Sequence, residues 1–409
     1  MKNLMTHLDK YAMLIVKTGV NVQSGDLVQL DISVNQAALA RLIVKKAYAA
    51  GARQVVLKWT DDTILREQVE NMEIEELRTV PEYKQAEMDD LVAQRISRIS
   101  VVSQDPGVFA GIPTERIEAY QQYDRKLLFG LRQVAAANKI RWTVVAAAEG
   151  PWAAKVFPEL AESEQVDALW DAIFKATKVY EADPVEAWRL HEKTLQEKAM
   201  MMNQEQFKAL HYQAPGTDLT IGLPENHVWD SARSINEKGF EFMANMPTEE
   251  IFTAPDRRVV DGVVASTKPL AYAGQVITGI SLTFKEGAII DVKAEQGEEV
   301  LKALVEMDEG SKYLGEVALV PDPSPISQSG IIFYSTLFDE NASNHLAIGN
   351  AYAFSIADGV EMSEKELGEH GLNRSKNHVD FMIGSDRMNI DGIRQDGSRI
   401  AIFRNGDWA

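Results

Sequence analysis

The sequence contains no cysteine and only 7 histidines among its 409 residues. The lack of cysteine excludes disulfide bonds, a thiol nucleophile, cysteine-ligated zinc and iron–sulfur clusters. Positive charge is also scarce, because 42 lysines and arginines stand against 61 aspartates and glutamates, a formal net charge of −19. Such an acidic surface repels phosphate backbones, so we expect no nucleic-acid partner. Metal ligands in this chain would have to be carboxylates and a few imidazoles.

Long apolar runs are lacking as well. The uncharged apolar stretches are far shorter than the roughly 20 residues that a membrane-spanning helix needs. Residues 1–20 are predicted to form an amphipathic helix, with apolar side chains at helical spacing and charged side chains between them. A secretory signal would instead show a continuous apolar run followed by small residues. We therefore expect a cytoplasmic protein with no membrane partner.

The first half of the chain has the alternating pattern of an α/β domain. Near-continuous apolar strands separated by helices predict a parallel sheet that is covered on both faces. No G-x-G-x-x-G and no G-x-x-x-x-G-K-S/T motif follows a strand, so the fold alone supports no nucleotide site. The predicted strands are residues 27–30, 54–59, 99–102 and 141–148, and the predicted helices are 35–50, 116–138, 164–177 and 184–210.

The second half changes character after a turn cluster at residues 214–218. Its pattern predicts an α+β domain with an antiparallel-rich sheet, including a hairpin in which Gly287 supplies the positive φ angle. We place the boundary between an N-terminal domain, residues 1–210, and a C-terminal domain, residues 211–409. The predicted strands are 219–223, 276–284, 288–294, 316–320, 378–384 and 399–403, with a helix at 298–306.

Two segments of the second half place carboxylates beside apolar residues. In MPTEEIFTAP, Glu249 and Glu250 are adjacent, so only one of them can enter a pocket from an extended chain. Taken alone, this segment is typical of an exposed acidic turn. Glu316 begins an otherwise apolar strand, where a buried carboxylate is costly unless it is paired or bound to a metal. A glutamate just clear of the core explains that pattern equally well.

Two further segments carry histidine. FDENASNHLAIGNAY has polar ligand types without helical or strand periodicity, and Glu340, His345 and Tyr352 each offer a ligand or an acid–base group. In HVDFMIG, His378 and Asp380 lie two residues apart on one face of a strand, which makes a compact two-ligand unit for a divalent cation. A histidine–aspartate pair that supports a site without binding metal is the alternative.

Together the four segments provide four carboxylates and two imidazoles. Such a set neutralises two divalent cations and leaves one carboxylate free to bridge them, and it suits Zn²⁺, Co²⁺ or Mn²⁺. The zinc-protease motif H-E-x-x-H is absent because no two histidines are four residues apart, so a single-zinc mechanism of the thermolysin type is excluded. The candidate ligands are Glu250, Glu316, Glu340, His345, His378 and Asp380.

In this order, MPTEEIFTAP, the Glu316 strand, FDENASNHLAIG and HVDFMIG resemble the motifs of the thermophilic-type metalloaminopeptidases, the family of aminopeptidase T and aminopeptidase S. FDENASNH is the most specific of them, and the resemblance runs over essentially the whole chain. It implies that a metal-activated water hydrolyses the N-terminal peptide bond of peptides with a free N-terminus. It also implies two divalent ions per chain (Zn, Co, Mn or Mg) and a homodimer whose two-domain subunits enclose a large internal cavity.

The resemblance also assigns roles to single residues. It makes the six candidate ligands the metal ligands, with Glu316 as the bridge, and Tyr352 the catalytic side chain beside the metals. The Tyr352 hydroxyl would stabilise the tetrahedral oxyanion. Glu249 is a candidate general base by its position. Two alternatives remain open: a dinuclear amidohydrolase acting on a C-terminal or non-peptide amide, and a non-catalytic acidic protein that binds metal or peptide.

Overall fold

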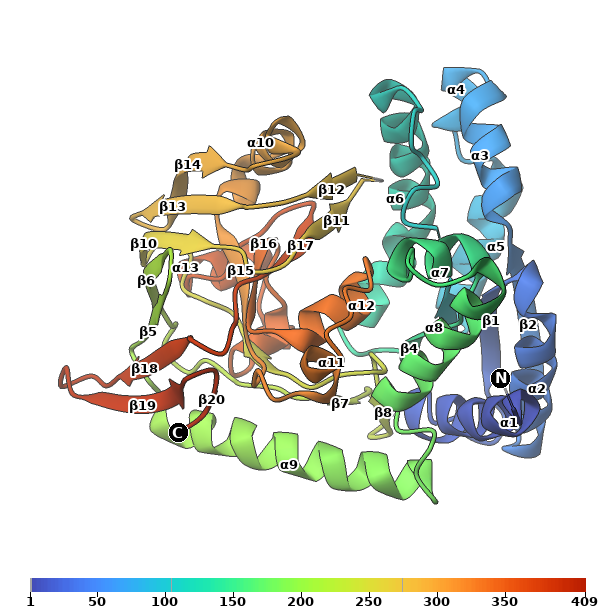
Figure 1. The fold of residues 1–409 in the computed structure, drawn as a ribbon, viewed down its shortest axis with the longest axis horizontal. Coiled ribbons are helices and arrows are strands. Elements are labelled where there is room, and N and C mark those ends of the chain that lie inside the picture. Colours follow the sequence, from blue (N-terminus) through green and yellow to red (C-terminus); the bar gives the residue numbers. More distant parts are fainter. Residues whose placement is uncertain (1, 104, 274) are drawn as a thin grey trace. The chain divides into compact units, whose positions relative to one another are not determined.

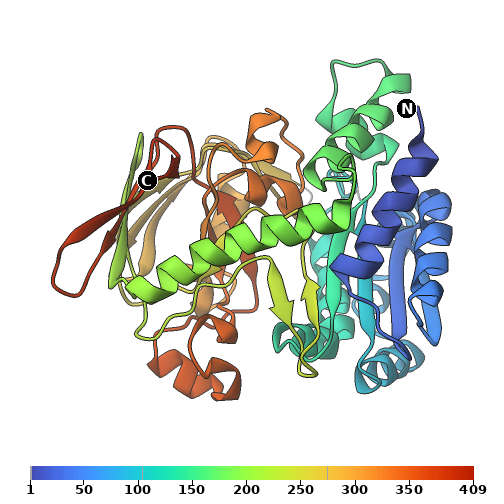
Figure 2. The same cartoon turned by 90° about the horizontal axis from the view of Figure 1, so that it is seen from below.

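The computed structural model describes residues 2–103, 105–273 and 275–409. The chain forms two compact units. The first comprises Met1–Leu190 and Arg233–Pro247, and the second comprises His191–Ala232 and Thr248–Ala409. The division falls within one long helix, α9 (Pro184–Glu205), which Figure 2 shows as an uninterrupted helix. The expected boundary between a domain of residues 1–210 and a domain of residues 211–409 stays a prediction.

The first unit is built on a four-stranded sheet whose strands all run parallel (Figure 1). The strand order is β2-β1-β3-β4. The central strands are apolar because both faces of the sheet are covered; in β1 only one of the seven residues is not fully buried. The expected parallel sheet is therefore confirmed. Its strands are β1 (Leu27–Ser33), β2 (Gln54–Thr60), β3 (Ser97–Val102) and β4 (Trp142–Ala146).

Helices occupy most of the chain between and after these strands. The sequence pattern did not predict α3, α4, α5 or α7. Of these, α3 and α4 each bury a single side chain, and α5 shows little apolar periodicity. The first helix ends at Leu14 and continues as a π-helix over Ile15–Gly19, and Met1 lies outside the described residues. The helices are α1 (Leu4–Leu14), α2 (Ala37–Ala49), α3 (Asp62–Asn71), α4 (Ile74–Leu77), α5 (Glu82–Ala93), α6 (Thr114–Ala136), α7 (Gly150–Val156) and α8 (Glu162–Ala176).

A later stretch of the chain, Arg233–Pro247, completes the first unit. It forms a hairpin of β7 (Arg233–Ile235) and β8 (Glu241–Met243). Beyond the hairpin, Val144 N donates to Ala244 O (2.7 Å) and Met246 N donates to Val144 O (3.0 Å). These two hydrogen bonds cover the outer edge of β4.

The second unit is mostly antiparallel, as expected. Its large sheet has the strand order β14-β13-β10-β6-β5-β18-β19-β20. The helices of this unit are α10 (Glu298–Val305), α11 (Pro325–Gln328), α12 (Thr336–Asp339) and α13 (Glu364–Glu369). The strands of the large sheet are β5 (Ala209–Ala214), β6 (Thr217–Gly222), β10 (Val260–Ala265), β13 (Ser281–Lys285), β14 (Ala288–Lys293), β18 (Asn389–Ile393), β19 (Arg399–Arg404) and β20 (Asp407–Trp408).

The hairpin around Gly287 is confirmed, but its first strand is shorter than expected. The prediction of one strand over residues 276–284 is wrong, because the chain breaks between β12 (Gln275–Ile277) and β13. Gly279 causes the break with a φ angle of 61°, and a Cβ there would lie 2.4 Å from Glu295 Cγ. β12 pairs instead with β11 (Leu270–Tyr272) in a separate two-stranded sheet.

None of the helices in the described part of the chain combines the length and the apolar character that a membrane span requires.

Candidate metal centre

A second sheet of the same unit brings distant parts of the chain together. Its antiparallel strands follow the order β17-β16-β15-β9. They are β9 (Ile251–Thr253), β15 (Leu314–Leu319), β16 (His345–Gly349) and β17 (His378–Met382). Glu250 immediately precedes β9, Glu316 lies within β15, His345 begins β16, and β17 carries the pair at positions 378 and 380.

The strand register places the candidate ligands on one face of this sheet. Glu316 and Asp380 both lie opposite Ala347, one on each side, so the three residues form a row across three strands. His345 precedes Ala347 by two residues, and His378 precedes Asp380 by two. Because side chains two residues apart on a strand point to the same face, both imidazoles share the face of the row. The small Ala347 leaves space between the two carboxylates.

A β-bulge in β15 directs Glu316 to this face. The register shifts between residues 314 and 316, so Gly315 is the extra residue. A Cβ on Gly315 would lie only 2.3 Å from Asn350 O, and His378 Nδ1 lies 2.7 Å from that same oxygen. Because residue 315 is a glycine, the bulge can lie close to Asn350 O. The same oxygen orients His378, so this contact helps to position both Glu316 and His378.

Glu340 is the candidate ligand that lies outside the sheet. It begins a turn of 3₁₀ helix, Glu340–Ala342, directly after α12, and its side chain is buried. The next residue, Asn341, accepts a hydrogen bond from Glu249 N at its side-chain oxygen (2.7 Å). This bond ties the turn to the segment before β9. Asn341 is a positioning residue that the sequence did not reveal, since the polar segment around it has no period.

The two adjacent glutamates face different partners. Glu250 Oε2 lies 3.0 Å from His345 Nε2, whereas Glu249 Oε2 lies 3.5 Å from Nε2 of His191 on α9. This is the outcome that alternation along an extended segment predicts. Glu249 is buried but belongs to none of the ligand groups found among the described residues. Its role as a general base stays a prediction.

The six candidate ligands converge into three groups that share members. In each group, one ligand atom from every residue lies within 4.8 Å of the others, and every residue except His378 is buried. The groups are Glu250 with Glu316 and His345, Glu316 with His378 and Asp380, and Glu340 with His345 and Asp380.

Glu316 lies between the two imidazoles. Its Oε1 is 3.6 Å from His345 Nε2, and its Oε2 is 3.5 Å from His378 Nε2. His378 Nε2 is also 3.5 Å from Asp380 Oδ1. One carboxylate that turns an oxygen toward each imidazole has the arrangement of a bridging ligand.

Backbone carbonyls orient both rings. His345 Nδ1 lies 3.1 Å from Ser343 O, and His378 Nδ1 lies 2.7 Å from Asn350 O. A ring that donates its Nδ1 hydrogen to a carbonyl keeps the lone pair of Nε2 for a metal ion. Both Nε2 atoms face the carboxylates, so the rings are presented as metal ligands.

The cluster is crowded with negative charge. Burial, followed by repulsion from neighbouring carboxylates, raises the pKa of Glu340 well above its usual range, and burial also raises the pKa of Glu316. Burial alone would lower the pKa of His345, but the neighbouring carboxylates of Glu250 and Glu316 raise that pKa well above the ordinary value. Buried carboxylates that hold protons this tightly also attract cations strongly.

Two buried oxygen atoms further support a cation site. Among the described residues, Glu250 Oε2 and Asp380 Oδ1 meet no hydrogen-bond donor in suitable geometry. A buried carboxylate oxygen without a donor is costly, and a cation removes that cost. The donor set of carboxylates and Nε2 atoms therefore fits divalent ions such as Zn²⁺, Co²⁺ or Mn²⁺.

Tyr352 lies beside the cluster in a small group of aromatic rings. Its ring centroid is 5.1 Å from that of His378, and its ring stacks on Phe354 at 5.1 Å with an interplanar angle of 11°. Phe252 packs edge-on at 6.4 Å. Burial, followed by the charge of Glu316, raises the pKa of the Tyr352 phenol, so its hydroxyl stays protonated and can donate a hydrogen bond.

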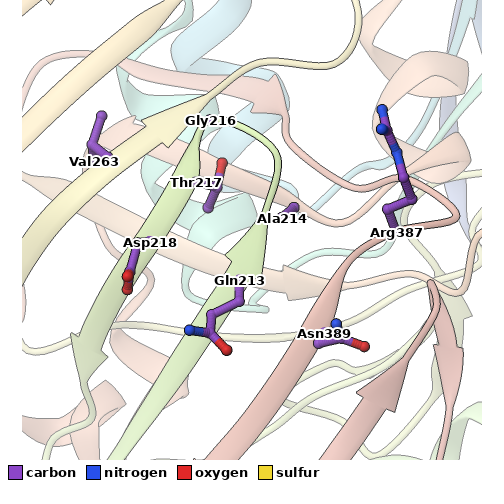
Figure 3. Close-up of a pocket in the computed structure, with 8 residues that line it drawn as sticks. All are labelled: Gln213, Ala214, Gly216, Thr217, Asp218, Val263, Arg387 and Asn389. Atoms are coloured by element: carbon purple, nitrogen blue, oxygen red, sulfur yellow. The ribbon is translucent and has the colours of Figure 1, made fainter.

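A separate hollow of about 580 Å³ lies where β5 turns into β6. Figure 3 shows that its side chains come from β5, β6, β10 and the start of β18. Asp218 Oδ1 lies 2.9 Å from His211 Nε2, and Arg387 stands well apart from Asp218 in Figure 3. No candidate ligand lines this hollow, so it is distinct from the cluster.

The row across the sheet gives a test of the cluster as a metal centre. Replacing Ala347 with leucine is expected to fill the space between Glu316 and Asp380, and to reduce the metal bound per chain by at least about half. The overpacking costs about 1–3 kcal/mol of unfolding free energy. Elemental analysis after metal loading measures the effect. The control A347G keeps the space open and should keep the metal; a normal metal content in A347L would contradict the placement.

Comparison with known proteins shows which family the chain belongs to. The family model described as "Thermophilic metalloprotease (M29)" matches residues 4–408. The aminopeptidase PepS of Streptococcus thermophilus is 55% identical over 407 residues, covering 99% of this chain and 98% of that protein. The aminopeptidase AmpS of Bacillus subtilis (strain 168) is 54% identical over 409 residues and the whole length of both chains.

A solved structure extends the agreement to three dimensions. Wild-type AmpT from Thermus thermophilus superposes with a TM-score of 0.92 at 37% sequence identity, and the match covers 99% of each chain. The expected combination of a parallel N-terminal sheet and antiparallel C-terminal sheets is thus confirmed. The family model covers residues 4–408 and the relatives are similar over almost the whole chain, so this chain belongs to the thermophilic metalloprotease family.

Proposed function

We propose that this chain is a metal-dependent aminopeptidase that hydrolyses the N-terminal bond of peptides at the cluster on the second sheet. The observation that carries the proposal is Glu316, whose two oxygens turn toward His345 and His378 and which belongs to two ligand groups. The names of the relatives, which are aminopeptidases, support it.

The proposed centre holds two divalent ions (Zn, Co, Mn or Mg), with Glu316 shared between them. Such ions would supply Lewis acidity for activating a water and polarising the scissile carbonyl. The ligands we assign to them are Glu250, Glu316, Glu340, His345, His378 and Asp380.

The other groups of the site would bind the substrate and stabilise the transition state. The ions, when bound, would also offer a position for the free amine of a peptide N-terminus. Tyr352 keeps its proton because burial raises its pKa, so its hydroxyl can donate to the oxygen that becomes negative when the carbonyl is attacked. The rings of Phe252 and Phe354 hold the Tyr352 ring in place. Tyr352 is therefore the catalytic side chain in this proposal.

Three broader features are part of the proposal, and of these only the homodimer rests on the family resemblance. We propose that the protein acts in the cytoplasm as a homodimer, and that residues 211–409 form the catalytic domain. Light scattering on the purified protein measures the number of subunits directly.

Blocking the substrate amine separates this function from its alternatives. The enzyme should hydrolyse leucine p-nitroanilide at least roughly a hundredfold faster than N-acetyl-leucine p-nitroanilide, because acetylation removes the free amine that anchors the substrate in the site. Steady-state kcat/KM on both compounds gives the ratio. Equal rates would favour an amidohydrolase without a free-amine requirement. A protein that keeps its metal and hydrolyses neither compound would be a non-catalytic binding protein.

A further inference from the structure

The first unit has a cavity of its own, with a volume of about 600 Å³. Ser33, Thr60 and Ser103 line it at the carboxyl ends of β1, β2 and β3, and Glu149 lines it from the segment after β4. The chain passes from β1 to β2 on one side and reaches β3 on the other, so the strand order reverses between β1 and β3. In open parallel sheets, ligands bind in the crevice at such a reversal.

The lining of this cavity is acidic. Asp61, Asp62 and Glu149 contribute carboxylates, and none of the described residues that line it is a lysine, an arginine or a histidine. Within the described part of the chain, Glu149 accepts hydrogen bonds from two neutral groups, Ser103 Oγ (3.0 Å) and Asn35 Nδ2 (3.2 Å). Burial, with repulsion from Glu149 and other carboxylates, raises the pKa of Asp62. A cation would relieve this repulsion, so the cavity favours a positively charged ligand.

The other lining groups suit an organic cation. Trp59, at the end of β2, lines the cavity although 47% of its surface is exposed, and Leu65 and Val34 add apolar surface. An indole face beside carboxylates is an environment that binds ammonium groups through cation–π contacts. A metal ion needs converging ligand atoms, and these carboxylates form no such group within the described part of the chain.

We propose that this cavity is a second binding site of the chain and that it takes a primary alkylammonium group, such as one end of an aliphatic diamine. The ammonium group donates hydrogen bonds to Asp62 and Glu149, and the carbon chain contacts Trp59 and Leu65. Tyr120 also lines the cavity, and its phenol stays neutral because burial raises its pKa to about 12. The site lies entirely within the first unit, so the proposal does not rest on the proposed peptidase activity.

Calorimetric titration of the intact protein with 1,4-diaminobutane tests the proposal. D62N and E149Q should each weaken binding about tenfold, since each removes a charge-assisted hydrogen bond. W59A should weaken binding about threefold. The matched control is E118Q, which removes an exposed carboxylate on α6; it should change the dissociation constant less than about twofold.

The outcomes separate this site from the metal cluster. Diamine that binds only at the cluster would bind D62N and E149Q with unchanged affinity, which would overturn the proposal. No binding up to roughly 10 mM would overturn it too. Thermal melting by circular dichroism identifies a variant that fails to fold, and W59A then tests the site with both carboxylates in place. The readout is binding, so its result is independent of whether the protein hydrolyses peptides.

Discussion

Replacement of Glu316 with alanine is expected to lower kcat/KM by roughly a thousandfold or more and to remove bound metal at the same time. Glu316 has one oxygen 3.6 Å from His345 Nε2 and the other 3.5 Å from His378 Nε2. Its loss therefore removes a ligand from two groups at once. The metal content of the variant, measured by elemental analysis beside its kcat/KM on leucine p-nitroanilide, checks the result.

Folding of the E316A variant can be separated from its activity. The cluster holds more carboxylates than imidazoles, so removing one carboxylate should leave the melting temperature of the metal-free protein unchanged or higher. Added metal should raise the melting temperature of the wild type but not that of the variant. The control E299A removes an exposed glutamate of α10 and should behave as wild type. Wild-type turnover in E316A would refute the bridging role.

Changing Tyr352 to phenylalanine is expected to lower kcat by about 10²–10³-fold while the metal stays bound. The substitution deletes one hydroxyl and keeps the ring, so the contacts with His378 and Phe354 persist. Burial raises the pKa of the phenol, so the hydroxyl keeps its proton and can donate a hydrogen bond. A loss in kcat with little change in KM would show that the bond forms mainly in the transition state.

A second buried tyrosine provides the matched control. Tyr212 on β5 is fully buried, and its hydroxyl has no partner among the described residues. Y212F should therefore leave kcat and metal content unchanged. If Y352F also kept the wild-type kcat, the tyrosine would have no part in the reaction.

The local patterns of the sequence predicted which residues share a face. The alternation in HVDFM places His378 and Asp380 together, and the structure has them on one face of β17. The adjacency of Glu249 and Glu250 correctly indicated that only one of them would join the cluster. These are short-range rules of strand geometry, so one segment is enough to apply them.

The pairing between segments could not be predicted in the same way. The row from Glu316 through Ala347 to Asp380 depends on register across three strands, and register is set by contacts between residues far apart in sequence. The bulge at Gly315 is also invisible locally, because it exists only relative to β16. Likewise, the nonperiodic segment around Glu340 gave no indication that a 3₁₀ turn would be followed, two residues later, by a strand.

The hydrogen bonds between β4 and residues 244–246 bear on how the protein is made. A ribosome releases the chain from its N-terminus, and domains generally fold as units in that order. The first sheet, however, keeps the outer edge of β4 unpaired until Ala244 and Met246 have been synthesised, about a hundred residues after Val144. During that interval the nascent chain presents an open strand edge of the kind that pairs with other chains. A truncated product ending at residue 210 would retain this edge permanently, which makes premature termination an aggregation hazard for this fold.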